Sequence, residues 1–198
     1  MTRSGPVTKD TSTIALGLAQ IRILESATNI ALIQPQASAS DSIGALANTK
    51  FMGNTDWFRL ESGFPLLEDY AVPIREAASL ECAFKEITPY NMALAYGLDP
   101  TGGSYAEEHS GEVALGGRTV PEYVRMEAKY TYPSGTDYMY IIFPRAQTGT
   151  AAIEVDLQVE DAAAVPVVFE AKRADSEIDG GSAVWDDKPL GRIFWNSD

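Results

Sequence analysis

Apolar and polar side chains alternate along much of this chain, which is the pattern of half-buried β-strands. The alternation is longest over residues 67–87 and most regular over residues 151–160. Shorter strand-like runs lie at residues 12–24, 56–61, 112–115, 120–132, 138–143, 165–171 and 189–195. The turn at residues 133–136 joins two of them as a hairpin. The pattern predicts about eight or nine strands.

One short helix is predicted at about residues 89–96. Thr88 is a good N-cap, Pro89 suits the first helical position, and Gly97 suits the stop. Because the strands do not alternate with helices, the pattern favours a mainly all-β fold. We expect an antiparallel β-sandwich or barrel with this helix at its flank.

Residues 25–55 keep neither the strand period nor the helix period, and they predict a long extended loop. Loops longer than about 12–15 residues are uncommon in compact domains and are usually functional or disordered. Disordered segments have few apolar side chains, but this segment contains Ile30, Leu32, Ile33, Ile43, Leu46, Phe51 and Met52. We therefore expect these side chains to contact another subunit. The alternative is a loop that folds back on its own domain.

Composition adds an acidic charge balance to this picture. The 198 residues suit one domain, which we place at residues 12–198 after a flexible polar arm at residues 1–11. The net charge of −13 argues against binding to nucleic acid or to an anionic membrane by bulk electrostatics. No apolar run reaches the roughly 18 residues of a membrane span. Cys82 and His109 are the only residues of their kinds, which excludes an intrachain disulfide and a Cys- or His-rich metal centre.

One acidic stretch has the spacing of a calcium-binding loop. Its carboxylates are Asp175, Glu177, Asp179 and Asp186, with Gly180 at the sixth position. However, the twelfth position is Asp rather than the longer Glu, and the flanks are strands rather than helices. A solvated acidic loop is the favoured interpretation. No sequence motif for phosphate binding or nucleophilic catalysis is present, so we expect no cofactor and no catalytic residues.

Three segments carry a family resemblance in addition to the order of the elements. The predicted helix reads Thr-Pro-Tyr-Asn-Met-Ala-Leu-Ala-Tyr-Gly-Leu over residues 88–98, and the chain closes with Pro-Leu-Gly-Arg-Ile-Phe-Trp over residues 189–195. Before the closing strand, Ala-Ala-Val-Pro-Val-Val-Phe-Glu-Ala-Lys-Arg-Ala-Asp leads into the acidic turn. Over residues 12–196 the chain resembles the major tail tube protein of long-tailed, siphovirus-type bacteriophages.

This resemblance implies a structural virion protein rather than an enzyme. Copies would form homohexameric rings, assembled in the host cytoplasm, that stack into a hollow tail tube for DNA ejection. Residues 25–55 would be the loop that joins the rings. The implied partners are other copies of the chain, a tape measure protein in the lumen during assembly, and tail terminator and distal tail proteins at the ends. DNA would pass without specific binding, and no membrane is involved.

The acidic charge gains a role in such a tube, because carboxylates that line the lumen would repel DNA. Glu81, Glu127, Glu154 and Asp156 lie on polar strand faces and are the candidates, although they could also face the outer solvent. Like charges across a contact destabilise it. We therefore expect acidic residues on the lumen and outer faces, and the fewer Lys and Arg residues at subunit contacts. The alternatives are another virion sandwich, such as a head decoration or tail terminator protein, or a carboxylate-dependent hydrolase.

Overall fold

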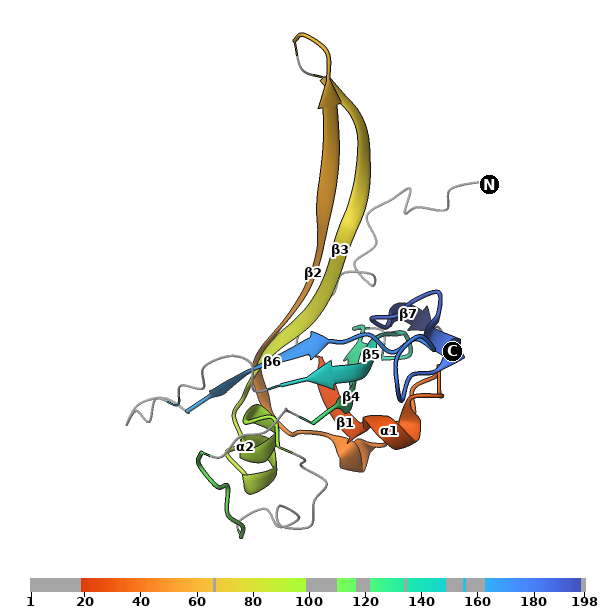
Figure 1. Ribbon diagram of the computed structural model, residues 1–198. Helices are drawn as coiled ribbons and strands as arrows, with labels where there is room; N and C mark the ends of the chain where they lie inside the picture. Colours follow the sequence, from red (N-terminus) through yellow and green to blue (C-terminus); the bar gives the residue numbers. More distant parts are fainter. Residues whose placement is uncertain are drawn as a thin grey trace.

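Antiparallel pairing joins the strands of this protein into one sheet (Figure 1). The computed structural model describes residues 19–65, 67–98, 110–116, 122–133, 135–148, 155 and 163–196. The strands are β1 (Gln20–Glu25), β2 (Leu46–Ser62), β3 (Leu67–Phe84), β4 (Val124–Thr131), β5 (Tyr138–Gln147), β6 (Val165–Ala171) and β7 (Arg192–Asn196). The helices are α1 (Ser26–Asn29) and α2 (Pro89–Ala95), and the 3₁₀ turns are η2 (Ala39–Asp41) and η3 (Ala183–Trp185). The predicted mainly all-β antiparallel fold with one short helix is confirmed.

The strand order is β1-β4-β5-β6-β3-β2, and β7 pairs with β5 beside the β5–β6 contact. The sheet curves around a core to which β1, β3, β4, β5, β6 and α2 all contribute buried side chains. The two ends of the strand order also approach each other. The Ile43 amide, just before β2, donates to the carbonyl of Ile21 on β1 at 3.2 Å. The curved sheet is therefore barrel-like.

Helix α2 forms where the sequence predicts it. The Thr88 hydroxyl accepts a hydrogen bond from the Asn91 amide at 3.1 Å, and Gly97 takes a φ of +71° at the stop. These are the N-cap and the left-handed C-terminal residue that such a helix needs. Leu94 packs into the core, and its carbonyl accepts from the Thr148 hydroxyl at 2.5 Å. This packing fixes α2 beside the end of β5.

Three sequence predictions differ from the structure or lie outside it. The strand expected at residues 112–115 is wrong, because the described residues 110–116 pair with no strand. Gly111 and Gly116 have positive φ values of 153° and 90°, and Leu115 between them is exposed. The arm predicted at residues 1–11 lies outside the described residues. The strand predicted at residues 151–160 also lies outside them, except for Val155.

A second cluster of buried side chains lies on the other side of the sheet from the core. It contains Ile30, Tyr140, Ile142, Ala174 and Trp185. The Trp185 indole donates to the carbonyl of Ile30 at 2.5 Å. The acidic loop at residues 174–188 and the segment after α1 therefore cover the outer side of β5.

The loop predicted at residues 25–55 is shorter than expected and folds back on its own chain. Strand β1 continues to Glu25, α1 follows, and β2 begins at Leu46. Ile30, Ile43 and Leu46 are buried inside this chain. The prediction that these three side chains contact another subunit is therefore wrong, because the chain's own sheet and loops already cover them.

A buried ion pair holds this loop against β4. Arg125 and Glu127 both have 0% exposed side chains, and Arg125 Nε lies 2.7 Å from Glu127 Oε1. The two terminal nitrogens of the same guanidinium donate to the carbonyls of Asn29, Leu32 and Gln34. The carboxylate accepts from the amides of Gln36 and Ala37 at 3.0 Å. Both charges are therefore satisfied by loop backbone as well as by each other.

We expect Glu127→Gln to lower the free energy of unfolding by about 3–5 kcal/mol, because it leaves a buried guanidinium without its counter-charge. Urea denaturation measures this loss. The matched control is Glu81→Gln, which removes an exposed ion pair with Lys50 at 3.5 Å. Exposed pairs contribute about 0–1 kcal/mol, so equal losses in the two variants would contradict the expected role of the buried pair.

Cys82 offers an independent measure of unfolding. Its side chain is 3% exposed, and burial raises the pKa of the thiol to about 12. Since only the thiolate reacts with alkylating reagents, we expect iodoacetamide to label the native protein very slowly at pH 8. In urea the thiol regains its ordinary pKa, and its thiolate fraction rises roughly a thousandfold. Rapid labelling of the native protein, followed by mass spectrometry, would be inconsistent with this burial.

Candidate assembly surface

Most of β2 and β3 forms a two-stranded ribbon that stands out from the sheet (Figure 1). Among the described strands, β3 pairs with β6 only over residues 79–84, so residues 67–78 pair with β2 alone. At about 3.3 Å per residue these positions span about 40 Å. We call residues 53–78 the ribbon. The sequence predicts the strands of its outer part, but it assigns the first half of β2 to a loop.

The ribbon exposes large apolar side chains, which a free sheet surface would ordinarily not carry. The exposed ones are Trp57, Phe58, Leu60, Phe64, Leu67, Tyr70 and Ile74. The register places Phe58 opposite Val72, Leu60 opposite Tyr70, and Ser62 opposite Leu67. Since opposite residues share a face of an antiparallel pair, one apolar ribbon face is formed by Phe58, Leu60, Leu67, Tyr70 and Val72.

The other face of the ribbon is mixed in character. Trp57 lies opposite Pro73, and Thr55 lies opposite Glu76. Arg59 Nη1 lies 2.9 Å from Glu68 Oε2, and both side chains are largely exposed. Because the charged side chains of Arg59, Glu68 and Glu76 lie on this mixed face, the apolar face is the one more favourable to bury.

Two irregularities in the pairing shape the ribbon. The register shifts between Asp56 and Trp57, where β3 has the extra residue Ile74. It shifts again between Leu60 and Glu61, where β3 has the extra residue Asp69. Bulges of this kind bend a strand and increase its twist. An irregular edge is also less able to pair with the strands of other chains at random.

The remaining predicted contact residues divide between the body and the root of the ribbon. Ile33 packs against the second cluster, beside Trp185. Leu32 and Phe51 are exposed, and Met52 is partly exposed. The Phe51 ring lies 6.4 Å from the Phe143 ring, measured between centroids, where the ribbon leaves the body. The exposed apolar surface therefore lies mainly on the ribbon rather than on the predicted loop.

The four carboxylates predicted to line a lumen are not equivalent. Glu127 is wholly buried beside Arg125, so its assignment to a lumen surface is wrong. The alternating pattern of β4 places it on a polar face, but the loop after α1 covers that face. Glu81 is partly exposed and lies 3.5 Å from Lys50. Glu154 and Asp156 lie outside the described residues.

The acidic loop directs its carboxylates toward groups of its own chain. Asp175 pairs with Arg173 at 2.8 Å, and Glu177 also pairs with Arg173. Asp186 accepts from the amide and the hydroxyl of Ser176, and these hydrogen bonds lower the pKa of the Asp186 carboxyl. Asp179 is exposed. Within the described ranges, no three His, Cys, Asp or Glu side chains are grouped to hold a metal ion.

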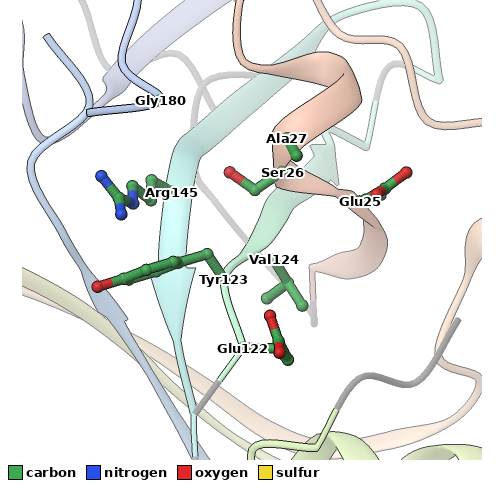
Figure 2. A pocket seen from close by; sticks show the side chains of 8 residues that line it. All are labelled: Glu25, Ser26, Ala27, Glu122, Tyr123, Val124, Arg145 and Gly180. Atoms are coloured by element: carbon green, nitrogen blue, oxygen red, sulfur yellow. The ribbon is translucent and has the colours of Figure 1, made fainter. Parts of the chain in front are cut away.

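A pocket lies where β4 and β5 meet α1 (Figure 2). Its lining residues are Glu25, Ser26, Ala27, Glu122, Tyr123, Val124, Arg145 and Gly180. The Arg145 guanidinium stacks on the Tyr123 ring, 3.8 Å from its centroid. The Ser26 hydroxyl donates to the carbonyl of Pro144 at 2.8 Å, which fixes α1 to β5. Ser26 and Arg145 thus use their polar groups in contacts within the chain. Half of the large apolar side chains that are exposed among the described residues lie on the ribbon instead.

Comparison with known proteins adds no relative to these observations. No family model matches the chain, and no curated protein matches its sequence. In the part of the chain that the structure describes, no helix has the length and apolar character to cross a membrane.

In dilute solution we expect the ribbon amides to exchange with solvent much faster than the amides of residues 79–84. In the described part of the chain the ribbon has two strands and no core packed against it, and such hairpins are only marginally stable in water. Residues 79–84 are paired on both sides, by β2 and β6. Hydrogen exchange followed by mass spectrometry measures the difference. Equal protection of the two regions in the unassembled chain would mean that the ribbon is stable without a partner.

Proposed function

We propose that this chain is a structural virion protein that self-assembles into stacked rings, which form the hollow tail tube of a long-tailed bacteriophage. The observation that carries the proposal is the ribbon, whose apolar face is left exposed by the described residues. The number of six copies per ring and the stacking of rings come from the resemblance of the sequence to major tail tube proteins.

The physical need of the ribbon for a partner supports self-assembly. A two-stranded sheet needs a third strand or a packed surface to be stable in water. Burying the apolar ribbon face against another copy would supply about 1.5–3 kcal/mol for each large side chain that becomes fully covered. Because every copy carries the same ribbon, contacts between copies can repeat along a ring or a tube.

The charge balance supports the passage of DNA through such an assembly. The net charge of −13 per copy is repeated in every subunit. Phosphate groups release counterions, and so gain binding energy, only when Lys or Arg side chains neutralise them. An acidic lumen would let DNA slide without being held. In this proposal a tape measure protein occupies the lumen during assembly, and tail terminator and distal tail proteins close the ends.

We expect negative-stain electron microscopy of the purified chain to show tubes or stacked rings. Leu60→Asp should abolish them, because it places a charge in the centre of the apolar ribbon face. The matched control is Leu115→Asp, since Leu115 is 76% exposed and Leu60 is 49% exposed, and Leu115 lies outside the ribbon. Tubes formed equally well by both variants would contradict the role of the ribbon.

A second variant tests the whole ribbon in the same experiment. Residues 55–76 are replaced by Asn-Gly, which forms a two-residue hairpin turn. Asn54 and Ala77 are paired in the native register, so the shortened hairpin keeps the pairing of the body. The variant should fold and remain monomeric. Isolated single rings of the intact chain, with no stacking under any condition, would favour a tail terminator instead.

A further inference from the structure

An aromatic and basic cluster lies on the same side of the sheet as the second buried cluster, shares the buried Tyr140 with it, and extends across β4, β5 and β7. Lys129, Tyr140 and Phe194 are neighbours in the register of these three strands. The Tyr140 and Phe194 rings stack, with centroids 5.3 Å apart and planes inclined by 9°. Lys129 Nζ lies 4.6 Å from the centroid of the Tyr138 ring. The Arg192 guanidinium covers the Phe194 ring at 4.0 Å.

The cations of this cluster have no acidic partner among the described residues. Arg22 donates to the Ala37 carbonyl and to Gln20, and Arg192 donates to Gln34. The Nε atoms of both arginines are buried and lack a hydrogen-bond partner in the described structure. We call this surface the aromatic–cation face. Its members are Arg22, Lys129, Tyr138, Tyr140, Arg192 and Phe194.

Such a face is unusual on this chain, which has 28 acidic and 15 basic side chains. Glu127, opposite Arg22 in the register, pairs with Arg125 instead. The three cations therefore repel one another, and they would be stabilised by an acidic group from elsewhere. Lys129, Arg192, Tyr138 and Phe194 are all partly exposed. Stacked rings beside cations suit a partner that is both apolar and acidic.

The outer end of the ribbon has this complementary chemistry. It presents Phe64, Leu60 and Leu67 to solvent. Beside them lie Glu61 and Asp69, neither of which pairs with a cation among the described residues, while Glu68 pairs with Arg59. The end of the ribbon is therefore apolar and net acidic. Its length of about 40 Å takes it away from its own body, as Figure 1 shows.

We propose that the ribbon end of one copy docks on the aromatic–cation face of a second copy. The inference rests on the proposed self-assembly and names the two surfaces that meet. The two surfaces are different, so the contact is heterologous, and its repetition generates a closed ring or an open helical array. Glu61 and Asp69 lie near Lys129 and Arg192 across the contact, and Phe64 packs on the partly exposed Tyr138 and Phe194 rings.

Complementation between two defective chains tests this contact. The ribbon-shortened chain, with residues 55–76 replaced by Asn-Gly, keeps only the face. Lys129→Glu/Arg192→Gln keeps only the ribbon. Analytical ultracentrifugation should find each variant monomeric when alone. Mixing the two should give a one-to-one complex, because the only intact ribbon then meets the only intact face. The matched control is Lys85→Glu, which changes an exposed cation outside both surfaces and should self-assemble like the intact chain.

The mixture of the two defective chains decides whether the ribbon binds the aromatic–cation face. Its intact ribbon comes from Lys129→Glu/Arg192→Gln and its intact face comes from the ribbon-shortened chain, so the proposal requires a complex limited to two copies. Two monomeric components that remain separate would overturn the proposal. Self-assembly of Lys129→Glu/Arg192→Gln to the level of Lys85→Glu would overturn it as well, because the ribbon would then bind a different surface.

Charge reversal gives a second and independent measurement. Glu61→Lys/Asp69→Lys should weaken association at least about tenfold, and combining it with Lys129→Glu should restore part of the loss. The affinity of the intact pair should fall as NaCl rises, because the contact is partly electrostatic. No recovery in the combined variant would overturn the pairing of these charges. Circular dichroism and slow Cys82 labelling check that each variant is folded.

The outcomes separate this inference from the proposed function. A one-to-one complex of the two defective chains without tubes from the intact chain supports the docking contact and contradicts the tail tube. Tubes from the intact chain with no complex in the mixture support the tube and overturn the docking contact. Binding of a fluorescent single-stranded oligonucleotide, lost in Lys129→Glu, would assign the face to nucleic acid and also overturn it.

Discussion

The buried pair of Arg125 and Glu127 is the interaction on which the body of this protein depends. The pair lies on β4, where side chains on both faces are covered. Its two side chains form hydrogen bonds with five backbone groups between residues 29 and 37. That segment would otherwise leave β4 open to water and its own carbonyls without partners. With it in place, Ile30 meets Trp185 and Ile43 enters the core. The charged pair thus holds a long irregular connection against the sheet, where it forms a second layer.

The sequence predicts those elements whose local signals agree with their packing. Helix α2 has its cap, its Pro and its terminal Gly, and Leu94 is buried as the pattern requires. The β4–β5 hairpin follows from alternation on both sides of a turn. Strand β3 is predicted nearly to its observed ends, since Leu80, Cys82 and Phe84 share one face of the alternating pattern and all three are buried. In each case the signal lies within a few neighbouring residues.

The errors arise where burial depends on distant parts of the chain. Glu127 stands at a position that alternation assigns to solvent, and only the loop some ninety residues earlier in the sequence covers it. Ile43 and Leu46 lack a regular period because they follow a bent segment, yet they reach the core. The ribbon gives the opposite case. Its alternation predicts strands correctly, but nothing in a run of strand-forming residues tells whether a third strand will pair with them.

The marginal stability of the ribbon bears on how an assembly of this chain would begin. A segment that orders fully only on contact adds an entropic cost to the first encounters. Later copies meet a partner whose ribbon is already held and whose neighbouring surfaces are already in place, so their addition costs less. Growth would therefore be cooperative, with a lag and a critical concentration. Free copies could accumulate as monomers until a preformed end acts as the template for polymerisation.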